Sequence, residues 1–254
     1  MSRLLALDGG ELEIEELPGD PSRPPLVFLH EGLGCIALWR DVPAALAAAT
    51  GRAALVFSRF GYGQSTVVTT PRRPDYMHRE AFEVLSELFD RLAIERPVLV
   101  GHSDGASIAL LHAATGRPVS GLVLLAPHVF VENRSIAGIR DAKIAFETTE
   151  LPTRMARYHR DAAATFRGWN DIWLSPEFRA WNIEACLPEV DVPVLVVQGA
   201  DDEYGTLRQV DAVEAGLAGP VERLVLEDCG HAPHVDRPDD VLPVIAAFVE
   251  ALPA

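Results

Sequence analysis

The sequence predicts an α/β fold: a doubly wound, mostly parallel eight-stranded sheet, flanked by helices and interrupted by an inserted α-helical segment. Short apolar runs alternate with longer helix-forming stretches along most of the 254 residues. The runs from residue 26 onward are apolar throughout, which is typical of parallel strands covered on both faces. Between residues 128 and 190 the alternation stops, and only helical stretches broken by prolines are present.

The expected strands cover residues 4–7, 11–17, 26–29, 55–58, 98–100, 122–125, 194–198 and 221–226. The second of them alternates apolar Leu12 and Ile14 with polar residues, as an antiparallel strand at the edge of a sheet does. Helices are expected at 38–49, 76–92, 105–114, 206–217 and 239–252. In a doubly wound sheet the carboxyl ends of the parallel strands share one edge, so motifs that follow these strands are expected to converge there.

Residues 101–105 read Gly-His-Ser-Asp-Gly between an expected strand and an alanine-rich expected helix. This is a G-x-S-x-G nucleophile elbow in the strand–turn–helix setting that gives the motif its meaning. Gly101 and Gly105 lack a Cβ, so the strand and the helix can approach each other closely. The turn presents the Ser103 hydroxyl at a helix N-terminus, where free N–H groups favour negative charge. Taken alone, the pentapeptide also fits an ordinary glycine-rich turn.

An acid and a base follow two later strands, which gives the chain order serine, aspartate, histidine. His231 follows the last expected strand, and Asp201 and Asp202 follow the strand before it. A serine hydroxyl is a poor nucleophile until a base takes its proton. An imidazole does so near neutral pH, while a carboxylate fixes its tautomer and stabilises the imidazolium. Asp228, in the same loop as His231, is a rival acid.

With these segments the chain resembles the α/β-hydrolase superfamily over essentially its whole length, in the serine-nucleophile branch that carries a helical cap. The resemblance implies that Ser103 is the nucleophile, His231 the base and Asp202 the acid of a catalytic triad. The acid of the family usually stands three residues after a glycine, and Gly199 therefore selects Asp202 over Asp201. The implied activity is that of an esterase-like hydrolase without an organic cofactor or a metal ion.

Two further segments carry the resemblance, after the third and fourth expected strands. Residues 29–34, Leu-His-Glu-Gly-Leu-Gly, look like the family's His-Gly-x-x-Gly oxyanion loop, and residues 61–65, Gly-Tyr-Gly-Gln-Ser, look like its Gly-x-Gly-x-Ser. They imply an oxyanion hole made by the backbone N–H groups of Gly32 and Asp104. Glu31 stands where the family has glycine, so it places a carboxylate beside the oxyanion loop and favours neutral substrates.

The resemblance also divides the chain into a hydrolase core, residues 1–127 and 191–254, and a cap, residues 128–190. In the cap, Phe166, Trp169 and Trp173 are spaced for one helix face. That face either packs the cap onto the core or roofs an apolar substrate pocket, and both hold if different residues do each. The candidate pocket residues are Glu31, His128, Trp169 and Trp173.

Composition and charge restrict the possible partners. The net charge of −15 argues against nucleic acid, whose phosphates it would repel. The three scattered cysteines do not suit a disulfide framework, and no apolar run approaches the roughly 20 residues that span a bilayer. We expect a cytoplasmic protein with a small-molecule substrate, no metal and no membrane partner, and leave its oligomeric state open. His78, His112 and His159 are expected on the surface or on helix faces.

The leading hypothesis is a serine hydrolase that cleaves a neutral carboxylic ester through an acyl-enzyme. The alternative is a carbon–carbon bond hydrolase of a ring-cleavage product, which uses the same triad and often carries Asn where His102 stands. A ligand-binding protein without turnover is the non-enzymatic interpretation. Epoxide hydrolases and dehalogenases of the superfamily use an aspartate where Ser103 stands, so the sequence disfavours both.

Overall fold

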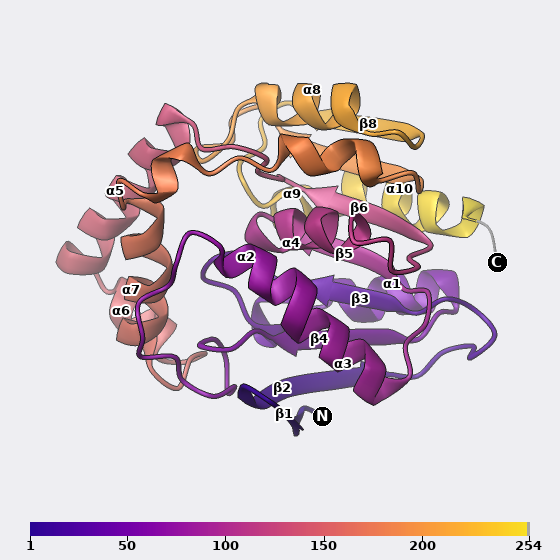
Figure 1. The fold of residues 1–254 in the computed structure, drawn as a ribbon, viewed down its shortest axis with the longest axis horizontal. Coiled ribbons are helices and arrows are strands. Elements are labelled where there is room, and N and C mark those ends of the chain that lie inside the picture. Colours follow the sequence, from indigo (N-terminus) through magenta and orange to yellow (C-terminus); the bar gives the residue numbers. More distant parts are fainter. Residues whose placement is uncertain (253–254) are drawn as a thin grey trace.

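Eight strands form one sheet in the computed structural model, which describes residues 1–252 (Figure 1). They are β1 (Arg3–Leu7), β2 (Gly10–Leu17), β3 (Leu26–Leu29), β4 (Ala54–Ser58), β5 (Val98–His102), β6 (Gly121–Leu125), β7 (Val194–Gly199) and β8 (Val221–Leu226). Their order across the sheet is β1-β2-β4-β3-β5-β6-β7-β8. The pairs β1–β2 and β2–β4 are antiparallel, and the other neighbouring pairs are parallel. The predicted mostly parallel sheet is confirmed.

Helices cover both faces of this sheet. They are α1 (Val42–Thr50), α2 (Tyr76–Arg79), α3 (Leu85–Leu92), α4 (Asp104–Ala113), α8 (Leu207–Gly216), α9 (Pro233–Asp236) and α10 (Pro238–Ala251). Leu26 and Phe28 of β3 belong to the apolar core under α1 and α10, whereas Val27 and Leu29 belong to the core under α3 and α4. Successive side chains of a strand point to opposite faces, so a wholly apolar run fills both cores at once.

Two expected helices are less regular than predicted. The helix expected at 38–49 begins only with α1, because a 3₁₀ turn covers Ile36–Trp39 before it. Pro43 lies in the first turn of α1, where a missing N–H removes no helical hydrogen bond. The helix expected at 76–92 contains a π-helical turn at Glu80–Val84, which separates α2 from α3.

Three α-helices lie between β6 and β7 in the described chain, namely α5 (Asn133–Thr148), α6 (Leu151–Met155) and α7 (Ala162–Trp173). Figure 1 shows them gathered beyond one end of the sheet, apart from the helices on its faces. Two hydrogen bonds tie the arms of this segment together, from Ile183 N–H to the Val129 carbonyl over 2.8 Å and from Val131 N–H to the Trp181 carbonyl over 3.3 Å. The segment therefore leaves and re-enters the core at neighbouring points.

Candidate active site

The turn between β5 and α4 holds Ser103 in a strained backbone conformation. Its φ is 54° and its ψ −118°, a region that residues with a side chain rarely adopt. Gly105 allows the turn, because a Cβ there would overlap the carbonyl of Leu29. The Ser103 side chain therefore stands at the carboxyl end of β5, directly before the N-terminus of α4. This is the strand–turn–helix setting that gives the pentapeptide its meaning.

The carboxylate of Asp202 is buried and is hydrogen-bonded to the imidazole of His231. Its Oδ2 lies 2.8 Å from His231 Nδ1 and accepts a hydrogen bond from the Gln198 side-chain amide over 2.6 Å. Its Oδ1 accepts from the N–H groups of Tyr204 and Gly205 over 2.7 and 3.1 Å. Both oxygens are fixed, and an ionised carboxylate can only accept, so the proton between the two side chains lies on Nδ1.

This pair moves both ionisations away from their ordinary values. Burial alone would raise the pKa of Asp202, but the charge and the hydrogen bond of His231 hold that pKa well below its usual value. Burial alone would lower the pKa of His231, but the Asp202 carboxylate outweighs burial and raises the pKa above 6.5. The imidazole is thus a strengthened base whose second nitrogen, Nε2, is turned away from Asp202.

Ser103 and His231 line the same small cavity, of about 80 Å³. Within residues 1–252 no hydrogen bond joins the two side chains, and such bonds often tighten only when a substrate is bound. The cavity is also lined by the predicted residues Glu31, Gly32, His128, Trp169 and Trp173. Leu33, Ile139 and Tyr204 line it as well. The last three lie in different segments of the chain, and no local pattern in the sequence singles them out.

A buried histidine, His30, fixes the loop after β3 through hydrogen bonds. The Nδ1 of His30 donates to the carbonyl of Glu31 over 2.7 Å, and its Nε2 accepts from the Arg59 N–H over 2.9 Å. Glycine is required at position 32, because a Cβ on Gly32 would overlap the indole of Trp169. The Gly32 N–H donates to no carbonyl of the described chain, so it is available to a ligand in the cavity.

The two acidic side chains near the predicted oxyanion hole point in different directions. Asp104 is buried, its Oδ2 accepts from the Tyr76 hydroxyl over 2.7 Å, and the same oxygen lies 3.7 Å from the guanidinium of Arg59. The Trp173 indole N–H donates to that hydroxyl over 3.0 Å. Glu31, in contrast, lines the cavity. The side chain of Asp104 is therefore turned away from the cavity. Its backbone N–H, in the first turn of α4, is the group of this residue that can donate to a ligand beside Ser103.

Further histidines surround His231. Burial and the nearby His231 lower the pKa of His128 to about 4, and the centroids of these two rings are 5.7 Å apart. Burial and a neighbouring histidine lower the pKa of His234 to about 3. His112 lies on helix α4, as one of the two predicted placements has it, but its side chain is buried and its Nδ1 contacts the Ala81 carbonyl. For His159 the prediction is wrong, because this residue lies outside the helices, is buried, and contacts backbone groups through both ring nitrogens.

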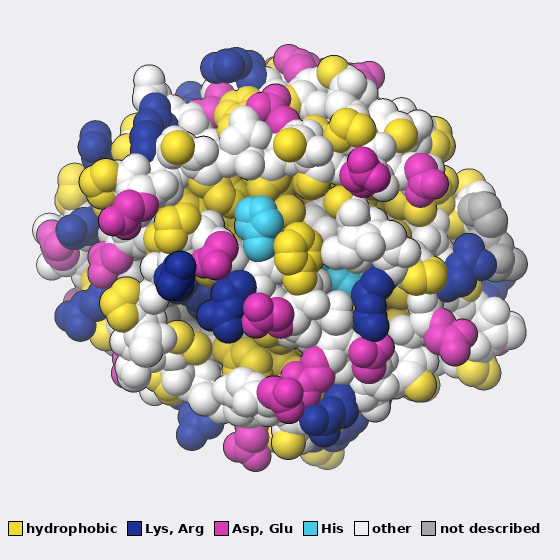
Figure 2. All heavy atoms as spheres, in the orientation of Figure 1, with side chains coloured by type: hydrophobic (Ala, Val, Ile, Leu, Met, Phe, Trp, Pro, Cys, Tyr) yellow, Lys and Arg dark blue, Asp and Glu magenta, His cyan; other side chains and the backbone are white. Residues whose placement is uncertain are grey.

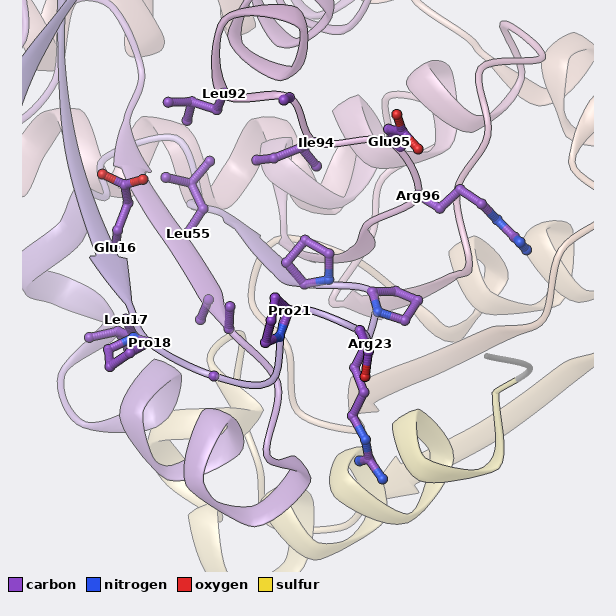
Figure 3. A pocket seen from close by; sticks show the side chains of 17 residues that line it. Glu16, Leu17, Pro18, Pro21, Arg23, Leu55, Leu92, Ile94, Glu95 and Arg96 are labelled. Carbon is purple, nitrogen blue, oxygen red and sulfur yellow. The ribbon is translucent and has the colours of Figure 1, made fainter.

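A larger cavity lies at the opposite edge of the sheet, beside the amino ends of β3, β4 and β5 (Figure 3). It measures about 760 Å³ and is lined chiefly by the proline-rich segment 16–25 and by residues 92–96. Its lining includes no histidine of the described chain, so it lacks the imidazole base of a serine–histidine pair.

Three broader features bear on partners. Residues 1–252 contain no group of three or more His, Cys, Asp or Glu side chains arranged to hold a metal ion. Among the helices of the same residues, none combines the length and the apolar character needed to cross a membrane. Figure 2 shows Lys and Arg interspersed with Asp and Glu, so the negative charge does not form one patch on this face.

Known proteins similar to this chain carry out different reactions. A family model described as the alpha/beta hydrolase family matches residues 26–244. A proline iminopeptidase from Lactobacillus helveticus is 23% identical over 269 residues, which cover 90% of each chain. Epoxide hydrolase A from Mycobacterium tuberculosis is 25% identical over 323 residues, which cover 98% of this chain and 97% of that protein. The crystal structure of VinJ is 25% identical, with a TM-score of 0.76 over 100% of this chain and 99% of that one.

Proposed function

This chain belongs to the alpha/beta hydrolase family, and from that premise we propose that it is a serine hydrolase that cleaves a neutral carboxylic ester through an acyl-enzyme. One observation carries the proposal: His231, hydrogen-bonded to the buried Asp202, lines the same cavity as Ser103. The relatives are named for a peptidase and an epoxide hydrolase, so the bond that is cleaved has to be argued from this chain's own groups. A serine hydroxyl beside an imidazole that is hydrogen-bonded to a carboxylate is the set of groups that catalyses acyl transfer.

In the proposed first step, the Ser103 Oγ attacks the ester carbonyl while Nε2 of His231 takes the hydroxyl proton. Asp202 stabilises the imidazolium that forms, because its Oδ2 lies 2.8 Å from Nδ1. The oxyanion accepts from the N–H groups of Gly32 and Asp104, and the loss of one such donor typically costs about 3–4 kcal/mol. His231 then gives its proton to the leaving alcohol, and the acyl group stays on Ser103.

Water completes the proposed cycle. His231 takes a proton from a water molecule, whose oxygen attacks the acyl carbonyl, and the same oxyanion hole stabilises the second tetrahedral intermediate. Collapse of this intermediate releases the carboxylic acid and returns the proton to Ser103. Each proton in this scheme passes through Nε2 of His231, so neither half-reaction calls for an organic cofactor or a metal ion.

We assign residues 128–190 as the cap of this site. Trp169 and Trp173 extend from α7 into the cavity wall, and Ile139 of α5 adds an apolar surface. A wall of this kind binds an uncharged acyl chain and excludes bulk water, which strengthens the electrostatic interactions of the site. The volume of about 80 Å³ favours a short acyl group.

We expect p-nitrophenyl butyrate to exceed its anionic analogue p-nitrophenyl hemisuccinate by at least ~10-fold in kcat/KM. No lysine or arginine of the described chain lines the cavity, so a substrate carboxylate would lose water without gaining a cation. The comparison requires fixed ionic strength, because the net charge of −15 also slows the approach of an anion. Faster turnover of the anionic ester contradicts the proposed preference for a neutral substrate, and faster turnover of a ring-cleavage dienoate contradicts the ester proposal and favours the carbon–carbon hydrolase.

The acid limb of kcat/KM for p-nitrophenyl butyrate is expected to have its midpoint above pH 6.5. Only the neutral imidazole of His231 accepts the serine proton, and the Asp202 carboxylate raises the pKa of that ring. Activity is therefore complete above this pKa and is lost as the pH falls through it. Rate measurements between pH 5 and pH 9 on the wild type and on Asp202→Asn provide the check, since the variant's residual activity should fall off at lower pH. A midpoint below 6 in the wild type contradicts the assignment of the base.

A further inference from the structure

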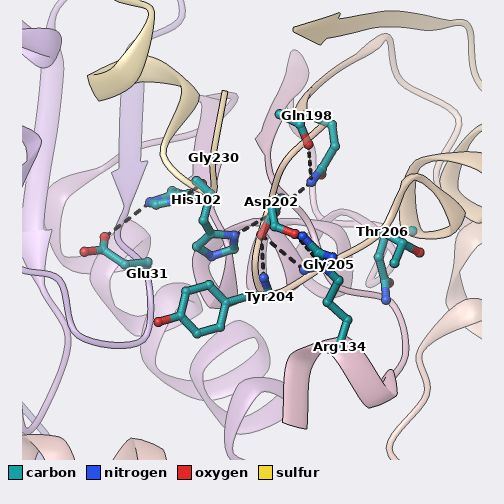
Figure 4. Close-up of polar contacts among 12 residues, drawn as sticks. Glu31, His102, Arg134, Gln198, Asp202, Tyr204, Gly205, Thr206 and Gly230 are labelled. Carbon is teal, nitrogen blue, oxygen red and sulfur yellow. Dashed lines mark hydrogen bonds and ion pairs between the residues drawn. The ribbon is translucent and has the colours of Figure 1, made fainter. Parts of the chain in front are cut away.

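Glu31 and His102 directly precede Gly32 and Ser103 in the chain, and His102 contacts the loop that carries His231. The Nε2 of His102 is 2.8 Å from the main-chain carbonyl oxygen of His231. Its other nitrogen, Nδ1, is 3.4 Å from Oε2 of Glu31 (Figure 4). The Glu31 carboxylate, the His102 imidazole and the His231 carbonyl thus form a continuous row of contacts. Its first two members directly precede Gly32 of the proposed oxyanion hole and the proposed nucleophile Ser103 in the sequence.

Hydrogen-bond chemistry fixes the number of protons in this row. A carbonyl oxygen only accepts, so Nε2 of His102 carries a proton. In a neutral ring Nδ1 would then be bare and would face a carboxylate oxygen, lone pair against lone pair. Nδ1 is buried and makes no hydrogen bond within residues 1–252, and the Glu31 oxygen at 3.4 Å is the charged group recorded against it. A proton between Nδ1 and Glu31 removes the repulsion and turns it into an ion pair.

The ionisation of Glu31 agrees with this arrangement. Burial alone would raise the pKa of Glu31, but its contact with His102 holds that pKa well below its usual value. The carboxylate is therefore charged, which makes it a suitable acceptor for a proton on Nδ1.

We propose that Glu31 and His102 share one proton and are positioning residues, which lock the His231 loop to the oxyanion loop and the nucleophile elbow. This inference rests on the proposed function, because it assigns a catalytic purpose to the alignment of these loops. It also gives a role to the glutamate that replaces the family's usual glycine.

The sheet order explains why such a lock is needed. His102 is the last residue of β5, whereas His231 follows β8, three strands away in the sheet. Neighbouring strands are about 4.8 Å apart, so the loop after β8 crosses about 14 Å to reach the elbow. The hydrogen bond from His102 Nε2 to the main-chain carbonyl of His231 fixes this loop where it reaches the nucleophile elbow.

Other titratable groups face the pair from every side. They are His30 and Arg59 beside the oxyanion loop, Cys35 before the 3₁₀ turn, His128 after β6, His159 between α6 and α7, His231 in the loop after β8, and His234 in α9. The rings of His234 and His102 are 4.8 Å apart at their centroids. Burial lowers the pKa of His234 to about 3, so this neighbour is neutral at pH 7 and does not compete for Glu31.

The first test compares two variants of nearly equal size with p-nitrophenyl butyrate. Glu31→Leu, which removes the partner of Nδ1, is expected to lower kcat about 10–100-fold with KM changed less than about 3-fold, because a misplacement near 1 Å costs up to about 100-fold. Glu31→Gln is expected to lose at least about 5-fold less than Glu31→Leu, because its amide N–H can donate to a bare Nδ1. Glu83→Gln, on an exposed helix surface, is the control and should change kcat less than about 2-fold.

A matched pair at His102 covers the case in which Glu31→Leu does not fold. Gln places an amide near the position of Nε2, whereas Asn is too short to reach it. His102→Gln is therefore expected to retain at least about 5-fold more kcat than His102→Asn. Equal losses within both pairs overturn the positioning role.

Nitrogen NMR of ¹⁵N-histidine-labelled protein at pH 7.5 tests the shared proton without reference to turnover. We expect His102 to show two protonated ring nitrogens in the wild type, and a bare Nδ1 in Glu31→Gln. A bare Nδ1 in the wild type overturns the shared proton. If the wild type hydrolyses no ester but His102 is doubly protonated, the proposed function fails while the shared proton stands, so the two failures are distinguishable.

Discussion

Ser103→Ala is expected to lower kcat/KM for p-nitrophenyl butyrate by at least ~10³-fold. The hydroxyl of Ser103 is the atom that forms the acyl-enzyme, and removing one member of such a triad leaves only the contribution of the oxyanion hole and of binding. The strained backbone at Ser103, with φ of 54°, serves to present that hydroxyl, so alanine in the same place keeps the turn and loses the chemistry.

Ser120→Ala is the matched control for this variant. Ser120 is also a buried serine, but its hydroxyl donates to the Arg96 carbonyl over 2.9 Å, at the amino end of β6 and away from the cavity. Its kcat/KM should stay within about 2-fold of the wild type. If Ser103→Ala retains activity comparable to that of Ser120→Ala, the nucleophile has been misassigned.

Asp202→Asn is expected to reduce kcat about 10⁴-fold with the fold intact. The amide presents either an N–H or a neutral oxygen to His231 Nδ1, so it no longer selects the tautomer that leaves Nε2 free, and it no longer stabilises the imidazolium. Gln198, Tyr204 and Gly205 hold the side chain of Asp202 in place, so a change in position does not account for the loss.

Asp228→Asn makes the same chemical change in the loop of His231 and is the control for Asp202→Asn. Asp228 has φ of 52°, a conformation that asparagine tolerates, so the backbone should be preserved. We expect the kcat of Asp228→Asn to stay within about 3-fold of the wild-type value, and the same of Asp201→Asn measured in parallel. A severe loss in Asp228→Asn would show that the acid lies in the loop of the base.

The fold could be predicted because its strands are local and strongly apolar. Val27 and Leu29 fill one core while Leu26 and Phe28 fill the other, so a fully buried strand needs apolar residues at each position and is visible as a run. Helix starts were harder to predict. The expected helix at 38–49 breaks where Arg40 takes φ of 52°, a backbone conformation that its neighbours in the sequence do not signal.

The candidate site was predictable where a motif follows a strand end, as for Ser103, Asp202 and His231. Contacts between distant segments were not. His102 and the carbonyl of His231 are 129 positions apart, and no periodicity records their hydrogen bond. The direction of the Asp104 side chain is equally hidden, because it depends on the Tyr76 hydroxyl on another helix.

Mass spectrometry after treatment with one equivalent of a p-nitrophenyl alkylphosphonate tests the central claim most directly. A phosphonate reacts only with a nucleophile that is activated and lies beside an oxyanion hole, so labelling reports the assembled site rather than the presence of a serine. We predict a single adduct, located by peptide mapping at Ser103, and none in Ser103→Ala. A stoichiometric adduct at any other residue, or one that persists in Ser103→Ala, would contradict the account.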